Sequence, residues 1–213
     1  ISLYNVENKK EKIADFKTAI SSTIRSLSNS EKIEVSFGNE SSKSGKNSIR
    51  LPDLSPINNK LNYNQIRALA DSKSLRHRFS DPKTFKQFEP VGNISKQLYK
   101  ISEKIRCEKI GTSYFKGVKN NIETFYQERV NGLDLKSSED KIVESFENYL
   151  RTKFLDFENN SQIDKKLKSY KKDLNDKFKG KMSQLNEFTL DQEKFNALVS
   201  ELISDMNLDE NLD

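Results

Sequence analysis

Residues able to do acid–base or metal chemistry near neutral pH are scarce in this sequence. Its 213 residues contain one histidine, His77, and one cysteine, Cys107. Histidine is the side chain whose ordinary pKa lies nearest neutrality, and structural zinc sites use several cysteines and histidines. A single cysteine also excludes an internal disulfide and is typical of a reducing compartment. We therefore expect no catalytic, cofactor-binding or metal-binding residues, a buried or half-buried Cys107 thiol, and a cytoplasmic protein.

The segment Gly38 to Lys46, GNESSKSGK, is the best candidate for binding a nucleotide. A phosphate-binding loop has four residues between its glycines and a Ser or Thr after its lysine. Here six residues separate Gly38 from Gly45, and Asn47 follows Lys46. The next element is also predicted to be a strand, whereas such a loop precedes a helix. We interpret residues 38–48 as the polar tip of a hairpin.

Asp71-Ser72-Lys73-Ser74 is similar to the D-x-S-x-S metal-binding loop of von Willebrand A domains. Lys73 occupies the position of the first required serine, and the segment has a helical pattern. This hypothesis is therefore rejected.

Arg76 and Arg78 flank His77 and place two or three cations on about one helical turn. One interpretation is a contact with an anionic partner, through phosphate or carboxylate groups. The other is an exposed helix end whose arginines pair with nearby acids. We predict Arg76 and Arg78 as partner-contact residues and keep the second interpretation open.

The net charge of +5 is distributed unevenly. Residues 1–110 contain 21 Lys and Arg against 12 Asp and Glu, a balance of +9, which leaves −4 for the remainder. From Met182 onward, Lys194 alone opposes eight acids. This distribution favours a partner of opposite charge, or an acidic linker that begins near the C-terminal end. No stretch has the length of uncharged apolar sequence that a membrane span needs.

Periodicity predicts a mainly α (α+β) fold with one small antiparallel β-hairpin at about residues 32–52. Ser137 and the pair Thr189–Gln192 are predicted helix N-caps. We predict a helical domain at 1–181, and a C-terminal helix with the start of an acidic linker at 182–213. The chain begins at Ile1 and not at Met, which indicates a fragment of a longer protein. Helices are expected at residues 11–28, 66–79, 94–111, 115–131, 142–154, 163–178 and 195–206.

Read as ordered blocks, the sequence resembles the amino-terminal region of the CobT family, subunits of the aerobic, ATP-dependent cobaltochelatase. Residues 67–75 form an R-x-x-A-D-S-x-x-L element that is similar to one in the family. No block is a catalytic signature, so their order carries the resemblance. The blocks are FKTAISSTIRSLS with IEVSFGNE and IRLPDL, then IRALADSKSLRHRFSDPK, ISEKIRCEKIGTSYFKGVKNNIETFYQERV and LDQEKFNALVSELISDMNL.

The resemblance implies a division of labour within a ring complex that uses ATP, magnesium and cobalt. A CobS-like AAA+ ATPase would hydrolyse ATP, a CobN-like large subunit would hold the corrinoid, and the CobT-type subunit would couple them. The family's von Willebrand A domain is absent from this chain. Histidines often found in the family around SDPK are replaced by Phe79, Phe85 and Phe88, which argues against a metal-related role there.

Our leading hypothesis is an assembly region with no active site of its own. A second hypothesis keeps the family but assigns the complex to remodelling of another metalloenzyme. A third, less favoured, is a basic nucleic-acid-binding module, which would bind with a steep salt dependence.

Overall fold

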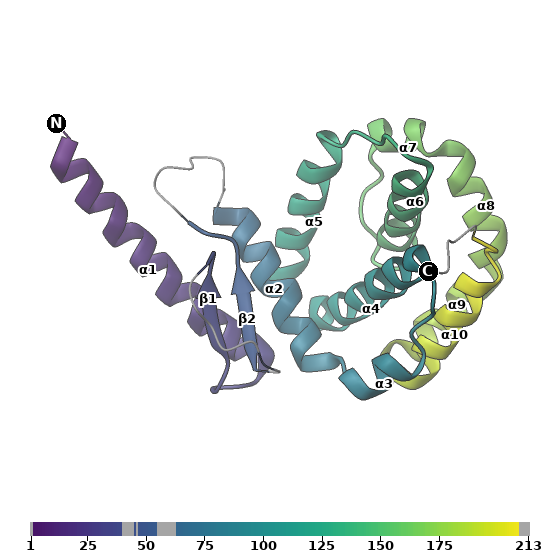
Figure 1. The fold of residues 1–213 in the computed structure, drawn as a ribbon, viewed down its shortest axis with the longest axis horizontal. Coiled ribbons are helices and arrows are strands. Elements are labelled where there is room, and N and C mark those ends of the chain that lie inside the picture. Colours follow the sequence, from purple (N-terminus) through teal and green to yellow (C-terminus); the bar gives the residue numbers. More distant parts are fainter. Residues whose placement is uncertain (1, 40–44, 46, 55–62, 209–213) are drawn as a thin grey trace. The chain divides into compact units, whose positions relative to one another are not determined.

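The computed structural model describes residues 2–39, 45, 47–54 and 63–208 (Figure 1). The chain forms two compact units. Unit 1 consists of Ile1–Arg78 and Gly117–Phe125, and unit 2 of Phe79–Lys116 and Tyr126–Asp213. The predicted mainly α fold is confirmed. The domain boundary predicted after residue 181 stays a prediction.

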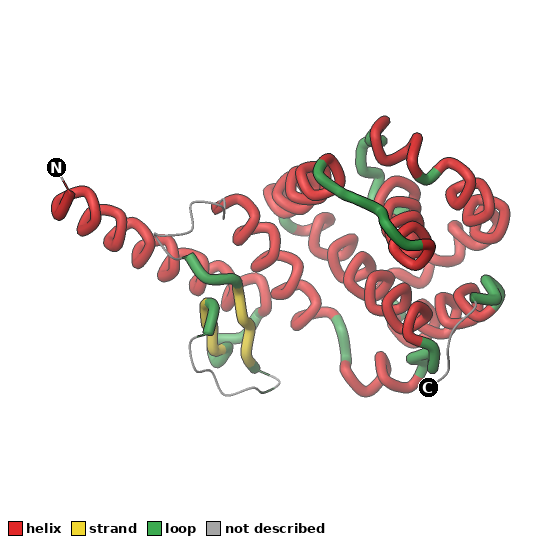
Figure 2. Tube along the Cα trace, turned by 45° about the horizontal axis from the view of Figure 1, so that its top comes forward, coloured by secondary structure: helices red, strands yellow, loops and turns green. Residues whose placement is uncertain are grey.

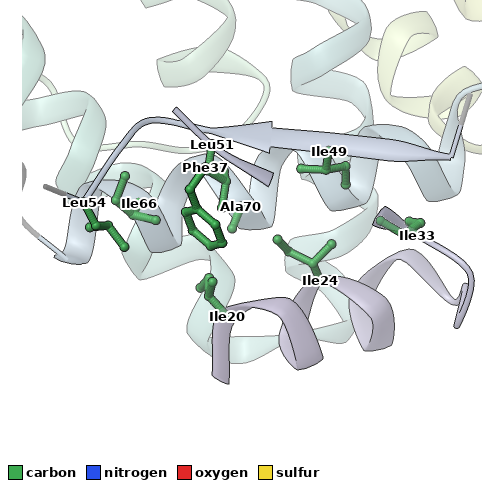
Figure 3. Close-up of a cluster of buried hydrophobic side chains, with 9 residues drawn as sticks. All are labelled: Ile20, Ile24, Ile33, Phe37, Ile49, Leu51, Leu54, Ile66 and Ala70. Carbon is green, nitrogen blue, oxygen red and sulfur yellow. The ribbon is translucent and has the colours of Figure 1, made fainter. Parts of the chain in front are cut away.

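Unit 1 packs two helices against a two-stranded sheet around an aliphatic core. Figure 3 shows Phe37 pointing from the sheet toward Ile20 and Ile24, with Ile66 and Ala70 supplied by the second helix. All five side chains are at least 95% buried. The elements of unit 1 are α1 (Ser2–Ser28), β1 (Glu34–Phe37), β2 (Ser48–Leu51), α2 (Tyr63–Phe79) and the first part of α5 (Lys116–Asn131).

The predicted antiparallel pairing of the two strands is wrong, because β1 and β2 pair in parallel. Their register runs from Glu34 opposite Ser48 to Phe37 opposite Leu51. Hydrophobic alternation says which face of a strand is buried but nothing about its direction, so the sequence pattern fitted both arrangements. A four-residue strand spans roughly 13 Å, which a connection of ten residues can retrace. Much of the predicted tip, residues 40–44 and 46, lies outside the described residues.

Gly38 makes the exit from β1 possible. Its φ is +60°, and its N–H donates to the carbonyl of Leu51 at 2.8 Å. A Cβ at this position would lie 2.7 Å from Cβ of Asp53. Only glycine fits both this backbone conformation and this close approach without strain.

Regular structure in the described part of unit 2 is helical throughout (Figure 2). The helix α4 packs against α6 and α10, α6 also packs against α8, and α10 against α3. Cys107 of α4 is fully buried, as predicted. None of the described helices in either unit combines the length and apolar character needed to cross a membrane. The elements of unit 2, besides the end of α5, are α3 (Pro82–Gln87), α4 (Asn93–Tyr114), α6 (Ser138–Lys153), α7 (Ser161–Lys166), α8 (Lys168–Phe178), η1 (Lys179–Lys181), α9 (Met182–Glu187), η2 (Phe188–Leu190) and α10 (Gln192–Ser204).

One of the two predicted helix caps is correct. Ser137 caps α6 in a reciprocal arrangement with Asp140, in which each side chain accepts from the backbone N–H of the other residue. The predicted cap at Thr189 is wrong. That residue lies inside η2, where its hydroxyl donates to the carbonyl of Asn186 at 2.8 Å. Asp191 caps α10 instead, accepting from the N–H of Lys194.

Candidate functional site

The α2 helix carries the most unusual polar side chains of unit 1. Ile66 and Ala70 are completely buried and pack one face of α2 against the core of unit 1. Arg67 and Asp71 are four residues apart, so they lie on the same side of the helix, one turn from each other. This side is adjacent to the buried face, which brings Asp71 into the interior.

A cavity of about 310 Å³ lies beside this side of α2, wholly within unit 1. It combines aromatic and aliphatic walls with a carboxylate, a guanidinium and an amide. This volume is at the lower end of the range for small-ligand sites. The lining residues are Phe16, Ala19, Ile20 and Thr23 of α1, Arg67 and Asp71 of α2, and Asn121 of α5.

Asp71 is the chemically distinctive residue of this cavity. It is 3% exposed, and its Oδ2 accepts a hydrogen bond of 2.9 Å from Nδ2 of Asn121. No other hydrogen bond and no salt bridge reaches its carboxylate from the described part of the chain. Burial raises the pKa of Asp71 from 3.8 to about 6, although the Asn121 hydrogen bond and the charge of Arg67 lower it in part. A carboxyl group perturbed in this way and facing a cavity makes the cavity a candidate functional site.

Arg67 is held by an aromatic side chain and not by the carboxylate. Its guanidinium carbon lies 5.5 Å from the centroid of the Phe16 ring, within the range of a cation–π contact. The Phe16 ring also contacts that of Tyr63, with centroids 4.6 Å apart. Arg67 is exposed, and none of the described residues accepts a hydrogen bond from it. Its guanidinium is therefore not held in place by hydrogen bonds from the described residues.

The predicted contact residues Arg76 and Arg78 lie in the last turn of the same helix. Arg78 is exposed, and its Nη1 donates to the carbonyl of Leu27 at 3.3 Å, at the end of α1. Arg76 is half-buried. Asp71 and Arg78 are seven residues apart and therefore share a side of α2, roughly 10 Å from each other. The structure brings Arg78 near the C-terminal end of α1, and the partner-contact role of both arginines stays a prediction.

Unit 2 buries its charges in a different manner, because every buried charge among its described residues is paired. Arg106 is 1% exposed and donates to both oxygens of Glu103 at 2.9 Å, and to the carbonyls of Phe79 and Thr189. Asn196 of α10 donates to the same Glu103 carboxylate at 2.7 Å. These bonds join α4 to η2, to α10 and to the segment before α3, so the role of this cluster is structural.

A second buried cluster joins α4 to α6 and to the end of α5. Arg151 donates to Glu108 at 2.8 Å and to Glu147 at 2.9 Å, and Arg129 pairs with Glu144 at 2.9 Å. Burial alone would raise the pKa of Glu147, but Lys104, Arg151 and Arg129 outweigh it and hold that pKa well below its usual range. The Glu147 carboxylate therefore stays ionised at neutral pH, as its contacts with Arg151 and Arg129 require.

Sequence reasoning missed Arg67, Asp71 and Asn121 as members of one site. Asp71 was considered only as a metal ligand, and that hypothesis was rejected. A usable signal was its position four residues before Leu75, because residues at this spacing lie on the same side of a helix. Among the residues that the structure describes, no group of three or more His, Cys, Asp or Glu side chains is placed to hold a metal ion.

Comparison with known families identifies the chain. The family model described as cobalamin biosynthesis protein CobT matches residues 10–213. The chain belongs to the CobT family. No solved structure matches it. Arg67 and Asp71 are the first and fifth residues of the sequence element R-x-x-A-D-S whose resemblance to CobT proteins is noted above.

The most specific CobT-like block, residues 101–130, contributes to both units. Its first part supplies Arg106 and Glu108 to the buried clusters of unit 2. Its second part supplies Asn121, which holds the Asp71 carboxylate in unit 1. Arg106 and Glu108 of this block therefore serve packing in unit 2, whereas Asn121 serves the cavity in unit 1.

Proposed function

We propose that this chain is the assembly region of a cobaltochelatase subunit of the CobT type. It couples a CobS-like AAA+ ATPase to a CobN-like large subunit that inserts cobalt into a corrin ring. The observation that carries the proposal is the match to the CobT family over residues 10–213, nearly the whole chain. In this scheme ATP, magnesium and cobalt are bound by the complex, and cobalt is its substrate.

Two physical features support a coupling role. A subunit that couples two other proteins must keep a single internal packing. Buried ion pairs favour one arrangement of the helices that they join, a role attested in other proteins. Unit 2 has such pairs between α4 and α6, through Arg151 and Glu108. Unit 1 supplies a polar cavity beside α2, which is suited to contact with a partner side chain.

The positive balance of the first 110 residues supports an anionic docking surface on the ATPase. Opposite charges across an interface increase the association rate and orient the partners. Arg76 and Arg78 are the proposed contact residues of this surface. Both lie on α2, within two to three turns of the cavity.

The test is association of the chain with the AAA+ ATPase in the presence of ATP and magnesium, measured by light scattering after size-exclusion chromatography. We expect one complex that contains both proteins, and at least tenfold weaker association for Arg76→Glu with Arg78→Glu. Lys172→Glu, an exposed charge reversal on α8 in unit 2, is the matched control and leaves association unchanged. Circular dichroism verifies that the double variant keeps its helices, because Arg78 also contacts the end of α1.

Separate elution of the wild-type chain and the ATPase would contradict the proposal. Tight binding of ATP by the chain alone, measured by calorimetry, would also contradict it, because the scheme places nucleotide on the AAA+ partner.

A further inference from the structure

Asp71 differs from the other buried acids of this chain. Five acidic side chains are buried in the described residues, and the four glutamates each have an arginine nitrogen within 2.9 Å. Asp71 has no such cation, although it is 97% buried. Burial of a carboxylate without an ion pair is costly, and a site that retains one in a cavity is prepared for a ligand that supplies the missing charge.

We propose that the cavity lined by Asp71 binds a basic side chain, a lysine or an arginine, of the protein partner. The ammonium or guanidinium donates to the Asp71 carboxylate, and the aliphatic stem lies along the apolar wall. The proposal rests on the proposed function only in taking the occupant to belong to a protein.

The polar groups of the cavity are placed to accept such a donor. Asn121 uses its Nδ2 to hold Oδ2 of Asp71, which leaves Oδ1 of the carboxylate and Oδ1 of the amide as acceptors. Lysine has three donors and arginine five, and neither has an acceptor. Two neighbouring acceptors, one of them charged, therefore match a basic side chain better than a neutral hydroxyl or an anion.

The apolar groups of the cavity match the rest of a basic side chain. Ala19 and Ile20 of α1 supply an aliphatic wall, and Phe16 supplies an aromatic one. Lysine and arginine pack their methylene stems on apolar surfaces while the charged group finds a polar partner. A cavity of about 310 Å³ accommodates one side chain of this kind.

Arg67 is the cation of this chain that could itself pair with Asp71. Its position explains why the Asp71 carboxylate can still accept a hydrogen bond from a ligand. The Arg67 guanidinium lies over Phe16, and it forms no salt bridge with Asp71 within the described residues. Because Arg67 is exposed, it can move outward when a second cation enters and so avoid like-charge repulsion.

The first test uses the isolated chain and small probes. The probes are N-acetyl-arginine amide and N-acetyl-lysine amide, with N-acetyl-norleucine amide as the neutral control and N-acetyl-glutamate amide as the anionic one. The titration of the Asp71 carboxyl is followed by carbon-13 NMR and assigned with Asp71→Asn. A basic probe at ten times its dissociation constant lowers the apparent pKa of Asp71 by about one unit, because it binds the ionised form.

An unchanged Asp71 titration with both basic probes would overturn the proposal, as would an equal change with the norleucine control. If only the glutamate probe changes the Asp71 titration, the cavity binds anions through Arg67. That result would also overturn the proposal.

The second test uses the complex with the AAA+ ATPase. Asp71→Asn weakens association at least tenfold, while Asp15→Asn, an exposed aspartate on α1, changes it less than twofold. Equal affinities of Asp71→Asn and wild type would overturn the proposal even if the complex forms. If the wild-type chain forms no complex, the proposed function fails, and the probe titration still decides what the cavity binds.

Discussion

Replacement of Asp71 by asparagine should stabilise the free protein at neutral pH. The carboxylate is buried without an ion pair, so its ionisation opposes folding. The pKa of Asp71 is raised from 3.8 to about 6. At about 1.4 kcal/mol for each pKa unit, this difference corresponds to a loss of at most about 3 kcal/mol of unfolding free energy when the carboxyl ionises.

The pH range of the effect follows from the direction of this change. Between pH 4 and 6 the folded chain keeps a proton on Asp71 that the unfolded chain has released, so the stability of the wild type falls as pH rises. Above about pH 7 the loss is complete and constant. Asp71→Asn cannot ionise, and its amide oxygen can still accept the hydrogen bond from Asn121. The variant should therefore match wild type near pH 3.5 and exceed it by about 2–3 kcal/mol at pH 7.5.

Urea denaturation of both proteins, followed by circular dichroism at 222 nm at several pH values, measures this difference. Other groups titrate equally in both proteins and cancel in the comparison. Asp15→Asn, an exposed substitution on α1, is the control and should show no pH-dependent difference of this kind. A difference between Asp71→Asn and wild type that is constant with pH, or a less stable variant at pH 7.5, would refute the reasoning.

Three further predictions test other parts of the structure. Glu147→Gln removes one of the two carboxylates that each of Arg151 and Arg129 contacts, so thermal unfolding should show a loss of about 2–3 kcal/mol; a loss below about 1 kcal/mol would contradict the buried network. Gly38→Ala strains a positive φ and approaches Asp53, so urea denaturation should show a loss of about 2 kcal/mol. Gly117→Ala, in open space on α5, should add about 0.5 kcal/mol; equal effects of the two glycine changes would count against the β1 exit geometry. Arg76→Glu alone should weaken ATPase binding several-fold in a titration at low salt, and an unchanged affinity would remove this residue from the proposed contact.

Most of the long helices were predictable because their apolar spacing is regular. The short helices α3 and α9 were not predicted, and the single helix predicted at 163–178 is divided at Leu167 into α7 and α8. The cap of α6 was also predictable, since Ser137 precedes Asp140 by the spacing of a capping box. The direction of the β1–β2 pair was not, because a period of two is the same in both directions. Only the contacts of Gly38 with Leu51 and Asp53 reveal how the chain leaves β1.

The buried charges could not have been located from the pattern of α6. Its polar residues Glu144, Glu147 and Arg151 have the appearance of a solvated face, yet all three are buried. Their partners Glu108 and Arg129 come from α4 and α5, and such distant pairings have no local signal in the sequence.

The candidate cavity could not be predicted from the sequence for the same reason. Arg67 and Asp71 could be placed on one side of α2 by their spacing, and a buried position for Asp71 followed from its distance to Leu75. The contribution of Asn121, fifty residues further along the chain, depends on how α5 meets α2 within unit 1. Family resemblance pointed to the segments that contain these residues, and the structure supplied the contact between them.

The coupling role itself is tested most directly by a bridging experiment with the immobilised AAA+ ATPase and the large chelatase subunit. The amount of large subunit retained is measured with ATP and magnesium, in the presence and absence of this chain. Retention that depends on the chain is the predicted result. Equal retention without the chain, or none when it is present, would contradict the account.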